Sequence, residues 1–541
     1  MAVSARGADT LARSIKAAGI TRLFTLSGNH IMPVFDAALS AGIELVHVRH
    51  EAGAVHMADA WARLTGEPGV ALVTGGPGHA NAVSALYTAQ MSESPVVLLS
   101  GHAPNRQAGW GAFQEMDQAA MAAPVTKASW AAGSAAGLAA DFARACRVAR
   151  SGRPGPVHLS LPTDTLEQSA DGPLPVARDY APVPMPLDAG QAATLVARLG
   201  RAQRPLVLVG PQGLTDAGRA RVAALQQAWG VPVVATESPR GANDPALGAF
   251  APMLARADCV LLLGKRLDFT LQFGQAFDAA CVFMQIDADE REWARTRRAL
   301  GERLQETLLA DTHAALDSLA SLSLRGLPEW LAQVETALAY RPPAWNEARG
   351  NGSGNGNGLH PAELCRAVQQ VLDTHPDSVL VCDGGEFGQW AQACLRAPHR
   401  VINGAAGAIG SALPMALAGR LAHRGAPVVA MMGDGTFGFH CAEIDTAVRY
   451  GLPFICVVGN DARWNAEYQI QLNSYGAERL VGCELLPTRY DRVAEGFGAR
   501  GAWVNQADEL ARALQDAVHA DVPTCVNVAL AGLPAPVVRQ A

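Results

Sequence analysis

The chain has 541 residues, of which 49% are hydrophobic and 17% charged, and its formal net charge at pH 7 is −7. This composition is typical of a folded globular protein long enough for three ordinary domains, and it excludes a disordered chain. The negative charge and the lack of a dense Lys/Arg stripe give no support to nucleic-acid binding. No apolar stretch approaches the roughly 18 residues of a membrane helix. We expect a cytoplasmic protein with no membrane contact, and we expect its ten scattered cysteines to be buried free thiols.

Short apolar strands alternate with helical segments throughout, which is the pattern of parallel α/β folds. The first third contains the strand candidates TRLFTL, LVHV, GVALVTG, SPVVLLSG and GPVHLSLP, and it ends at a proline-studded segment, 173–186. A second α/β unit begins at RPLVLVG and continues through VPVVAT, DCVLLLGKRLD and CVFMQIDAD.

The stretch RGNGSGNGNG at 349–358 is too rich in Gly and Asn to pack, and it marks the clearest boundary in the chain. After it, SVLVCDGG, PVVAMMGDG, PFICVVGND and TCVNVAL restart the alternation. The sequence therefore predicts an α/β protein with three consecutive doubly wound parallel-sheet domains. Their predicted bounds are 1–172, 187–340 and 359–541, with a Gly/Asn-rich linker at 341–358.

The strongest local signal lies in PVVAMMGDGTFGFHCAEIDTAVRYGLPFICVVGND. One strand ends at the GDG turn around Asp434, and the next strand ends at Asn460 and Asp461. Because the carboxyl ends of parallel strands share one edge of a sheet, these side chains can converge there. Glycines let the backbone approach a ligand, the following helix start favours phosphate oxygens, and an oxygen-only set suits Mg²⁺. GDG alone would indicate only a tight turn, but the Asn/Asp pair favours a diphosphate and metal site.

A GDG turn followed about 26 residues later by a pair of Asn-type residues resembles the binding motif of thiamine diphosphate (ThDP) enzymes. The resemblance covers almost the whole chain and is closest to the acetolactate synthase, benzaldehyde lyase and 2-hydroxyacyl-CoA lyase group. It implies a pyrimidine-binding, a central and a diphosphate-binding domain, in that order. It also implies that Asp434, Asp461 and the carbonyl of Arg463 hold Mg²⁺. Asp461 stands where the family has Asn, and Asn460 is the alternative ligand if the loop is shifted by one residue.

The same resemblance places further residues near the cofactor. In GAAGAIGSALPMALAG, Ile409 would be the bulky apolar residue that bends ThDP, and Gly407 would offer a carbonyl to its 4′-amino group. A Gly/Ala-rich helix start packed against a strand is equally compatible with this segment. DGGEFGQW and GGPGHANAV resemble the phosphate-side and pyrimidine-side loops of the family. The expected cofactor contacts are Pro77, Asn81, Gly385, Glu386, Phe387, Gly407, Ile409, Gly433, Gly435 and Thr436.

Glu51 lies where a strand runs into a helix, in IELVHVRHEAGAVHMADAWARLTG. Taken alone, it would be an acidic residue that favours the positive end of a helix dipole. Its surroundings resemble those of the family's buried carboxylic acid, which hydrogen-bonds N1′ of ThDP and promotes loss of the C2 proton. In the family the site forms between two chains. We therefore expect a homodimer at minimum, favour a homotetramer, and expect an isolated chain to be inactive.

Two more residues are candidates for the reaction itself. GAFQEMDQAAMAAPVTK resembles the Phe-Gln-Glu stretch of acetolactate synthases and acyl-CoA lyases, so Gln114 would point at the substrate. FTLSGNHIMPVF resembles a loop of benzaldehyde lyase and brings His30 near the substrate, where a histidine can shuttle protons. A loop histidine satisfied by the backbone is an equal alternative. We expect substrate preference to be set in the segment 460–476, where the sequence departs from better-known relatives at Trp464, Asn465, Glu467 and Gln469.

The central segment LLLGKRLDFTLQFG resembles oxalyl-CoA decarboxylase and 2-hydroxyacyl-CoA lyase, whose central domain binds an adenine nucleotide such as ADP; in acetolactate synthases it binds FAD. Lys265 and Arg266 could contact phosphate or form a solvated pair at a strand end. No Gly-rich dinucleotide fingerprint is present. The resemblance implies a ThDP- and Mg²⁺-dependent lyase or carboligase for small-molecule carbonyl substrates, namely 2-oxo acids or acyloins. The alternatives are a 2-hydroxyacyl-CoA lyase or oxalyl-CoA decarboxylase type, and a FAD-containing oxidoreductase of the pyruvate oxidase type.

Overall fold

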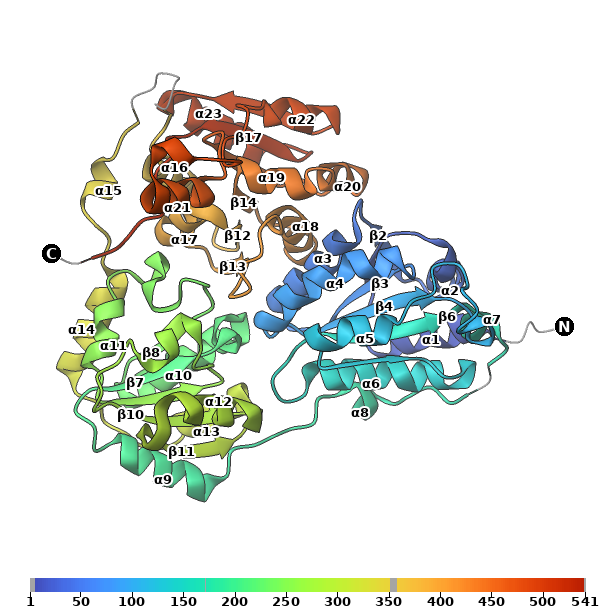
Figure 1. Cartoon of the computed structure of the whole chain (residues 1–541), viewed down its shortest axis with the longest axis horizontal. Coiled ribbons are helices and arrows are strands. Elements are labelled where there is room, and N and C mark those ends of the chain that lie inside the picture. The colour runs from blue at the N-terminus through green and yellow to red at the C-terminus, as the bar shows by residue number, and fades with distance from the viewer. Residues whose placement is uncertain (1–4, 171, 351–357, 540–541) are drawn as a thin grey trace. The chain divides into compact units, whose positions relative to one another are not determined.

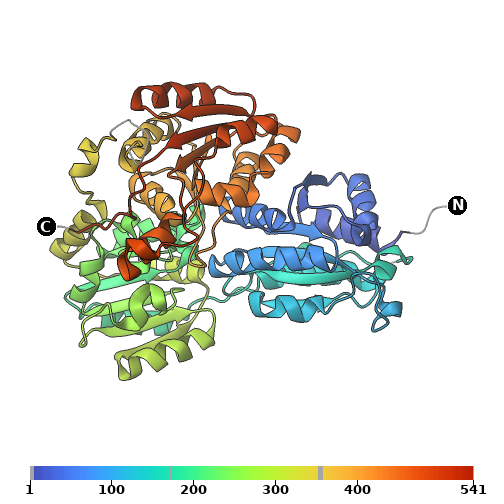
Figure 2. The same cartoon turned by 45° about the horizontal axis from the view of Figure 1, so that its top comes forward.

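The computed structural model describes residues 5–170, 172–350 and 358–539. Three sheets carry helices on their faces (Figures 1 and 2). Among the described residues, all strand pairs within these sheets are parallel. The predicted fold class, three consecutive α/β domains that each contain a parallel sheet, is thus confirmed. Residues 351–357 of the predicted linker lie outside the described residues, and the domain bounds stay a prediction.

The first sheet has the strand order β2-β1-β3-β4-β6-β5. The order reverses between β1 and β3, and ligands bind at such switch points in open α/β sheets. Its strands are β1 (Arg22–Thr25), β2 (Glu44–His47), β3 (Gly69–Val73), β4 (Val96–His102), β5 (Ala128–Ala131) and β6 (Val157–Pro162). The accompanying helices are α1 (Gly7–Ala17), α2 (Met32–Ser40), α3 (Glu51–Thr65), α4 (Pro77–Met91), α5 (Gln118–Ala122), α6 (Leu138–Arg150), α7 (Thr163–Glu167) and α8 (Ala177–Tyr180).

The second sheet has the order β11-β10-β9-β7-β8 and a switch point between β7 and β9. Its strands are β7 (Pro205–Val209), β8 (Val233–Ala235), β9 (Cys259–Leu263), β10 (Val282–Asp287) and β11 (Leu304–Leu309). Around them lie α9 (Ala189–Leu199), α10 (Asp216–Trp229), α11 (Ala251–Arg256), α12 (Glu290–Leu300), α13 (Thr312–Ala320), α14 (Pro328–Ala339) and α15 (Ala344–Glu347).

The third sheet has the order β13-β12-β14-β15-β17-β16, with its switch point between β12 and β14. Its strands are β12 (Val379–Cys382), β13 (His399–Ile402), β14 (Val428–Gly433), β15 (Ile455–Asn460), β16 (Arg500–Val504) and β17 (Thr524–Ala529). Its helices are α16 (Pro361–Asp373), α17 (Gly385–Cys394), α18 (Ala412–Ala422), α19 (Asp434–His440), α20 (Glu443–Arg449), α21 (Asn465–Tyr475), α22 (Tyr490–Gly496) and α23 (Ala507–Val518).

Two compact units divide the chain, and each is described by itself. The first contains Met1–Val183, Leu413–Arg424 and His440–Pro453, so it includes the first sheet and α20. The second contains Pro184–Ala412, Gly425–Phe439 and Phe454–Ala541, and it holds the other two sheets. The GDG turn and the residues up to Phe439 therefore belong to the second unit, whereas His440–Pro453 belongs to the first.

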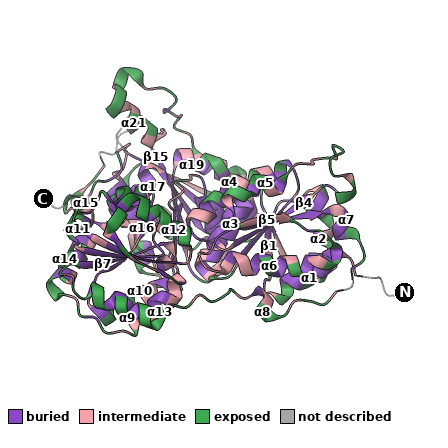
Figure 3. Ribbon diagram, turned by 60° about the horizontal axis from the view of Figure 1, so that its bottom comes forward, coloured by how far each residue is buried: buried purple, intermediate pink, exposed green. Residues whose placement is uncertain are grey.

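Apolar strand residues form the cores of both units, because residues of parallel strands covered on both faces are shielded from water. Figure 3 shows α3 as almost entirely buried, whereas α21 has a largely exposed surface. All ten cysteines are free, and the expectation that they are buried is confirmed for eight of them, while Cys394 and Cys441 are half-buried. No helix among the described residues has the length and apolar character needed to cross a membrane.

Candidate active site

Glu51 is the first residue of α3 and is 9% exposed. Its Oε2 accepts a hydrogen bond of 3.1 Å from Nδ2 of Asn81, which lies on α4. The turn that begins α4 passes close to the same carboxylate, since a Cβ on Gly78 would lie 3.2 Å from Glu51 Oε1. The ends of β2 and β3 thus bring together Glu51, Asn81 and the loop that contains Pro77, which were predicted from two separate motifs.

Gln114 lies against the Gly75–Pro77 loop. Gly76 has a φ of 61°, and a Cβ on it would come within 2.7 Å of the Gln114 Cβ. The Gly76 N–H donates to Oε1 of Gln118 at 2.9 Å, which ties the same loop to α5. Gln114 itself has a φ of 57°, a left-handed conformation that side chains adopt rarely and that clusters at functional sites. The predicted catalytic Gln114 therefore lies next to the predicted cofactor loop.

His30 is 3% exposed and lies in a short turn after β1. Its Nδ1 forms a 3.2 Å hydrogen bond with the Thr74 hydroxyl, and its ring stacks on Phe113 at a centroid distance of 5.9 Å. Burial lowers its pKa, so the neutral ring dominates at pH 7 and is able to accept a proton. His30 thus contacts the stretch that contains Gln114, as expected for a group near the substrate, and it is also hydrogen-bonded to the backbone of Phe113, which fits the alternative of a histidine satisfied by the backbone.

In the second unit, the predicted metal residues meet at neighbouring strand ends. β14 and β15 are paired in parallel with Gly433 opposite Gly459, which brings Asp434 and Asp461 to one edge. Asp434 is 1% exposed, and its Oδ2 has no hydrogen-bond partner among the described residues. Burial raises the pKa of Asp434, and burial together with the Asp434 charge raises the pKa of Asp461. Two carboxylates held this close, one with an unpaired buried oxygen, fit a divalent cation.

Asn460, Arg463 and Thr436, which are close in sequence to the Asp434 and Asp461 pair, each contact other protein groups. Asn460 donates from Nδ2 to the Thr488 carbonyl at 2.9 Å and to Asn527 Oδ1 at 3.2 Å, and its Oδ1 accepts the Ala462 N–H at 3.2 Å. The Asn460 side chain is thus already engaged inside the sheet. The Arg463 guanidinium lies 4.1 Å from the ring centroid of Tyr468. In the GDG turn itself, the Thr436 hydroxyl donates to the Gly433 carbonyl at 3.0 Å.

The loops after β12 and β13 meet at the same edge through Asp383, a residue the sequence reasoning missed. Its buried carboxylate accepts N–H groups from Gly384 at 2.7 Å, Gly410 at 2.9 Å and Ala412 at 3.0 Å. The bonds tie the DGGEF loop to the segment that contains Gly407 and Ile409. An acidic residue directly after a buried strand, in SVLVCDGG, is the signal that would have found it.

The remaining predicted cofactor contacts lie around these loops. Gly385 and Gly407 have φ values of 76° and 68°, which suit glycine. Phe387 packs its ring against Gly459, since a Cβ there would meet the ring at 2.5 Å. Glu386 also contacts the loop after β8, where Arg240 donates to its carboxylate at 2.9 Å.

Trp464 covers the GDG turn. A Cβ on Gly435 would lie 2.7 Å from two ring atoms of Trp464, and the ring meets Phe439 edge to face at 6.1 Å. The Trp464 N–H donates to the Cys483 carbonyl at 2.9 Å, which fixes the start of α21. Trp464, one of the four residues expected to set substrate preference, is therefore in direct contact with the predicted diphosphate turn.

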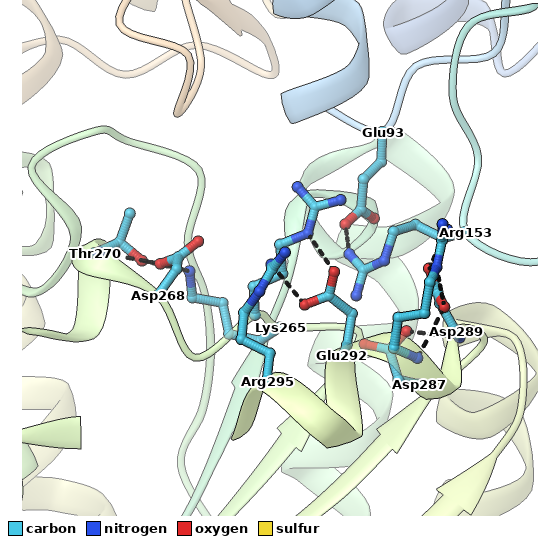
Figure 4. A network of polar contacts seen from close by, with 11 residues as sticks. Glu93, Arg153, Lys265, Asp268, Thr270, Asp287, Asp289, Glu292 and Arg295 are labelled. Atoms are coloured by element: carbon cyan, nitrogen blue, oxygen red, sulfur yellow. Dashed lines mark hydrogen bonds and ion pairs between the residues drawn. The ribbon is translucent and has the colours of Figure 1, made fainter. Parts of the chain in front are cut away.

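Lys265 and Arg266, which follow β9 in the central sheet, both lie near carboxylate side chains. Lys265 is 6% exposed and donates to the Thr270 hydroxyl at 2.7 Å, with Asp268 at 3.9 Å. Arg266 pairs with Glu292 at 3.2 Å, and Glu292 also binds Arg295 (Figure 4). The interpretation of a solvated strand-end pair is wrong, because both cations have carboxylate partners and Lys265 is shielded from water.

The chain is thus an α/β protein with a buried glutamate at a helix start in one unit and a pair of carboxylates at neighbouring strand ends in the other. Three family models match the chain: the thiamine pyrophosphate enzyme N-terminal TPP binding domain at 5–121, its central domain at 192–319, and its C-terminal TPP binding domain at 383–528. Thiamine pyrophosphate is the same compound as ThDP.

Curated relatives agree over nearly the full length. The chain is 33% identical to 2-hydroxyacyl-CoA lyase 2 of Bos taurus, over 94% of this chain and 87% of the relative. It is also 33% identical to the acetolactate synthase large subunit of Mycobacterium tuberculosis, over 96% and 94% of the two chains. The human 2-hydroxyacyl-CoA lyase 2 is 31% identical over 94% and 87%. The chain belongs to the family of ThDP-dependent enzymes, within its acetolactate synthase and 2-hydroxyacyl-CoA lyase group.

Proposed function

We propose that this protein is a ThDP- and Mg²⁺-dependent lyase or carboligase that breaks or joins C–C bonds in 2-oxo acids or acyloins. The observation that carries the proposal is the pair Asp434 and Asp461 at adjacent strand ends, with a buried Asp434 oxygen that has no partner among the described residues. Bound ThDP supplies the electron sink for such reactions, and the protein supplies binding, orientation and protons.

The metal ligands in this proposal are the carboxylates of Asp434 and Asp461 and the carbonyl of Arg463. Asp461 is preferred to Asn460, because the Asn460 side chain is already hydrogen-bonded within the sheet. The described residues hold no group of three or more His, Cys, Asp and Glu side chains that could bind a metal. A site with two carboxylates and a backbone oxygen suits Mg²⁺, which takes its other ligands from water and a diphosphate.

Glu51 is the proposed acid that holds a proton at N1′ of the cofactor. Its burial and the Asn81 hydrogen bond restrict the carboxylate to one orientation, as a proton donor and acceptor at a fixed atom requires. Pro77 and Asn81 are the proposed contacts on the pyrimidine side. On the diphosphate side we propose Gly385, Glu386, Phe387, Gly407, Ile409, Gly433, Gly435 and Thr436.

Gln114 and His30 are the proposed groups on the substrate side. The left-handed backbone at Gln114 holds its position against the Gly76 turn. His30 is buried and neutral, so it is suited to take a proton from a hydroxyl group and return it. The ring of Phe113 covers His30 and limits the access of water.

The acting form in this proposal is a homodimer at minimum, with a homotetramer favoured, because Glu51 and Asp434 belong to different units and the family builds its site from two chains. We also propose a cytoplasmic location. Ten free cysteines support it, since disulfides are rare in the reducing cytosol. No nucleotide is proposed for the central sheet, where Lys265 and Arg266 are paired with protein groups.

A substrate panel tests the reaction. Purified protein with ThDP and Mg²⁺ is given pyruvate, benzoin-type acyloins and 2-hydroxyacyl-CoAs, and products are identified by mass spectrometry, with Asp434→Asn as the matched inactive control. Turnover of a 2-oxo acid or an acyloin supports the proposal. Cleavage of 2-hydroxyacyl-CoAs alone supports the second candidate, a 2-hydroxyacyl-CoA lyase, which the names of the bovine and human relatives favour. If no substrate is turned over in a ThDP-dependent way, both proposals fail.

A further inference from the structure

A buried glutamate outside the proposed site lies beside the start of α3. Glu443 is the first residue of α20 and is fully shielded from solvent, whereas Asp445 on the same helix reaches the surface. An isolated carboxylate is costly to bury, so its oxygens require hydrogen-bond donors. Burial also raises the pKa of Glu443.

Its donors are the two main-chain N–H groups that precede Glu51. The Arg49 N–H lies 3.0 and 3.3 Å from the two carboxylate oxygens, and the His50 N–H donates to Oε1 at 3.2 Å. The Thr446 hydroxyl donates to Oε2 at 2.7 Å. These bonds fix the backbone that leads into Glu51, and they leave the Glu51 side chain to Asn81.

Gly53 leaves room for this carboxylate in the first turn of α3. A Cβ on residue 53 would lie 2.7 Å from Glu443 Oε1. Glycine is unfavourable inside a helix compared with alanine, so a space requirement explains its presence here. His50 completes the turn: its Nδ1 accepts the Ala52 N–H at 3.1 Å, and its carbonyl accepts the Gly53 N–H at 2.9 Å.

We propose that Glu443 is a positioning residue that fixes the Arg49–His50 main chain and thereby sets the direction of the Glu51 carboxylate. This inference rests on the proposed role of Glu51. Glu443 comes from the segment that follows the GDG turn, so one stretch of sequence supplies both Asp434 and the group that orients Glu51. Two sides of Glu51 are then held: the side chain by Asn81 and the main chain by Glu443.

The test compares Glu443→Gln with the matched control Asp445→Asn, both loaded with ThDP and Mg²⁺. Glutamine keeps the shape but replaces one acceptor oxygen with an NH₂ group, so the Arg49 and His50 N–H groups, which now contact two oxygens, are left with the single remaining acceptor. Asp445→Asn removes the same charge from the same helix, where Asp445 pairs with the Arg49 and Arg449 side chains. The readouts are the Kd for ThDP and the rate at which the C2 proton of bound ThDP exchanges with D₂O.

We expect Glu443→Gln to change the Kd by less than about threefold and to slow C2 exchange roughly 10- to 100-fold, as a misplaced catalytic group does. The control should leave both readouts near wild type. A folded Glu443→Gln variant with wild-type exchange overturns the proposal. If that variant does not fold, Gly53→Ala is measured instead, because its methyl group displaces the same carboxylate from the side of α3. Slowed exchange in Gly53→Ala supports the proposal, and wild-type exchange overturns it.

Glu51→Gln in the same experiment separates this inference from the proposed function. Wild-type exchange in Glu51→Gln contradicts the role of Glu51 itself. Slow exchange in Glu51→Gln with normal exchange in a folded Glu443→Gln contradicts only the positioning role.

Discussion

Gly435→Ala is expected to weaken ThDP binding through a collision with the Trp464 ring. The new Cβ would lie 2.7 Å from two ring atoms, whereas ordinary contacts begin at 3.4 Å, so the ring or the turn must move by at least 0.7 Å (3.4 − 2.7). The ring is held by Phe439 and its backbone by Cys483. Overpacking of this kind costs about 1–3 kcal/mol, which corresponds to a Kd roughly 5- to 150-fold weaker.

A double-mutant cycle isolates this cause. ThDP binding is measured by calorimetry at saturating Mg²⁺ for wild type, Gly435→Ala, Trp464→Ala and the double variant. Gly438→Ala on the same helix is the matched control, because its Cβ would meet no atom within 4 Å. In the Trp464→Ala background, Gly435→Ala should weaken ThDP binding by less than about 0.5 kcal/mol. The difference between this loss and the loss with the ring present is the coupling energy, which is typically about 0.5–3 kcal/mol for residues in contact. An equal loss with and without the ring would refute the packing explanation.

Asp461→Asn removes the repulsion of two buried carboxylates, so we expect a higher Tm without metal and a smaller rise in Tm when Mg²⁺ and ThDP are added. An unchanged Tm without metal would contradict this. Acid stability depends on buried neutral histidines: burial lowers the pKa of His79 to about 4. Because the unfolded chain binds a proton there at a pKa of about 6.5, the free energy of unfolding falls as pH drops through 6.5 toward 4, by about 2 kcal/mol at pH 5 from His79. Urea unfolding at pH 7 and 5 should show a smaller fall for His79→Gln than for wild type; equal falls would exclude this cause.

Local sequence patterns were sufficient for the fold and for the convergence of the two strand ends after β14 and β15, whereas Glu51, Gln114 and His30 were singled out only by the family resemblance. Apolar strands alternating with helices predict parallel sheets, and polar residues that directly follow such strands must gather at one edge. The sequence therefore predicts that Asp434 lies near Asn460 and Asp461, and the structure has these residues at neighbouring strand ends. Their roles, and that of Glu51, stay predictions.

Contacts between distant segments could not be predicted in this way. Glu443 bonds to Arg49, which is 394 residues away in the sequence, and no periodic pattern relates the two. Lys265 looked like a solvated cation because a lysine at a strand end usually reaches water, but the loop that follows carries Thr270 and Asp268 back over it. Side-chain pairing of this kind depends on loop conformation, which one sequence does not specify.

The most direct test of the role of Glu51 is the C2 proton exchange of bound ThDP in wild type and Glu51→Gln, at equal and saturating occupancy with Mg²⁺. We predict that the substitution leaves ThDP bound and slows exchange at least about 100-fold, since general acid–base catalysis contributes about 10²–10⁴-fold. Wild-type exchange in a folded, ThDP-loaded Glu51→Gln variant would contradict the proposed role.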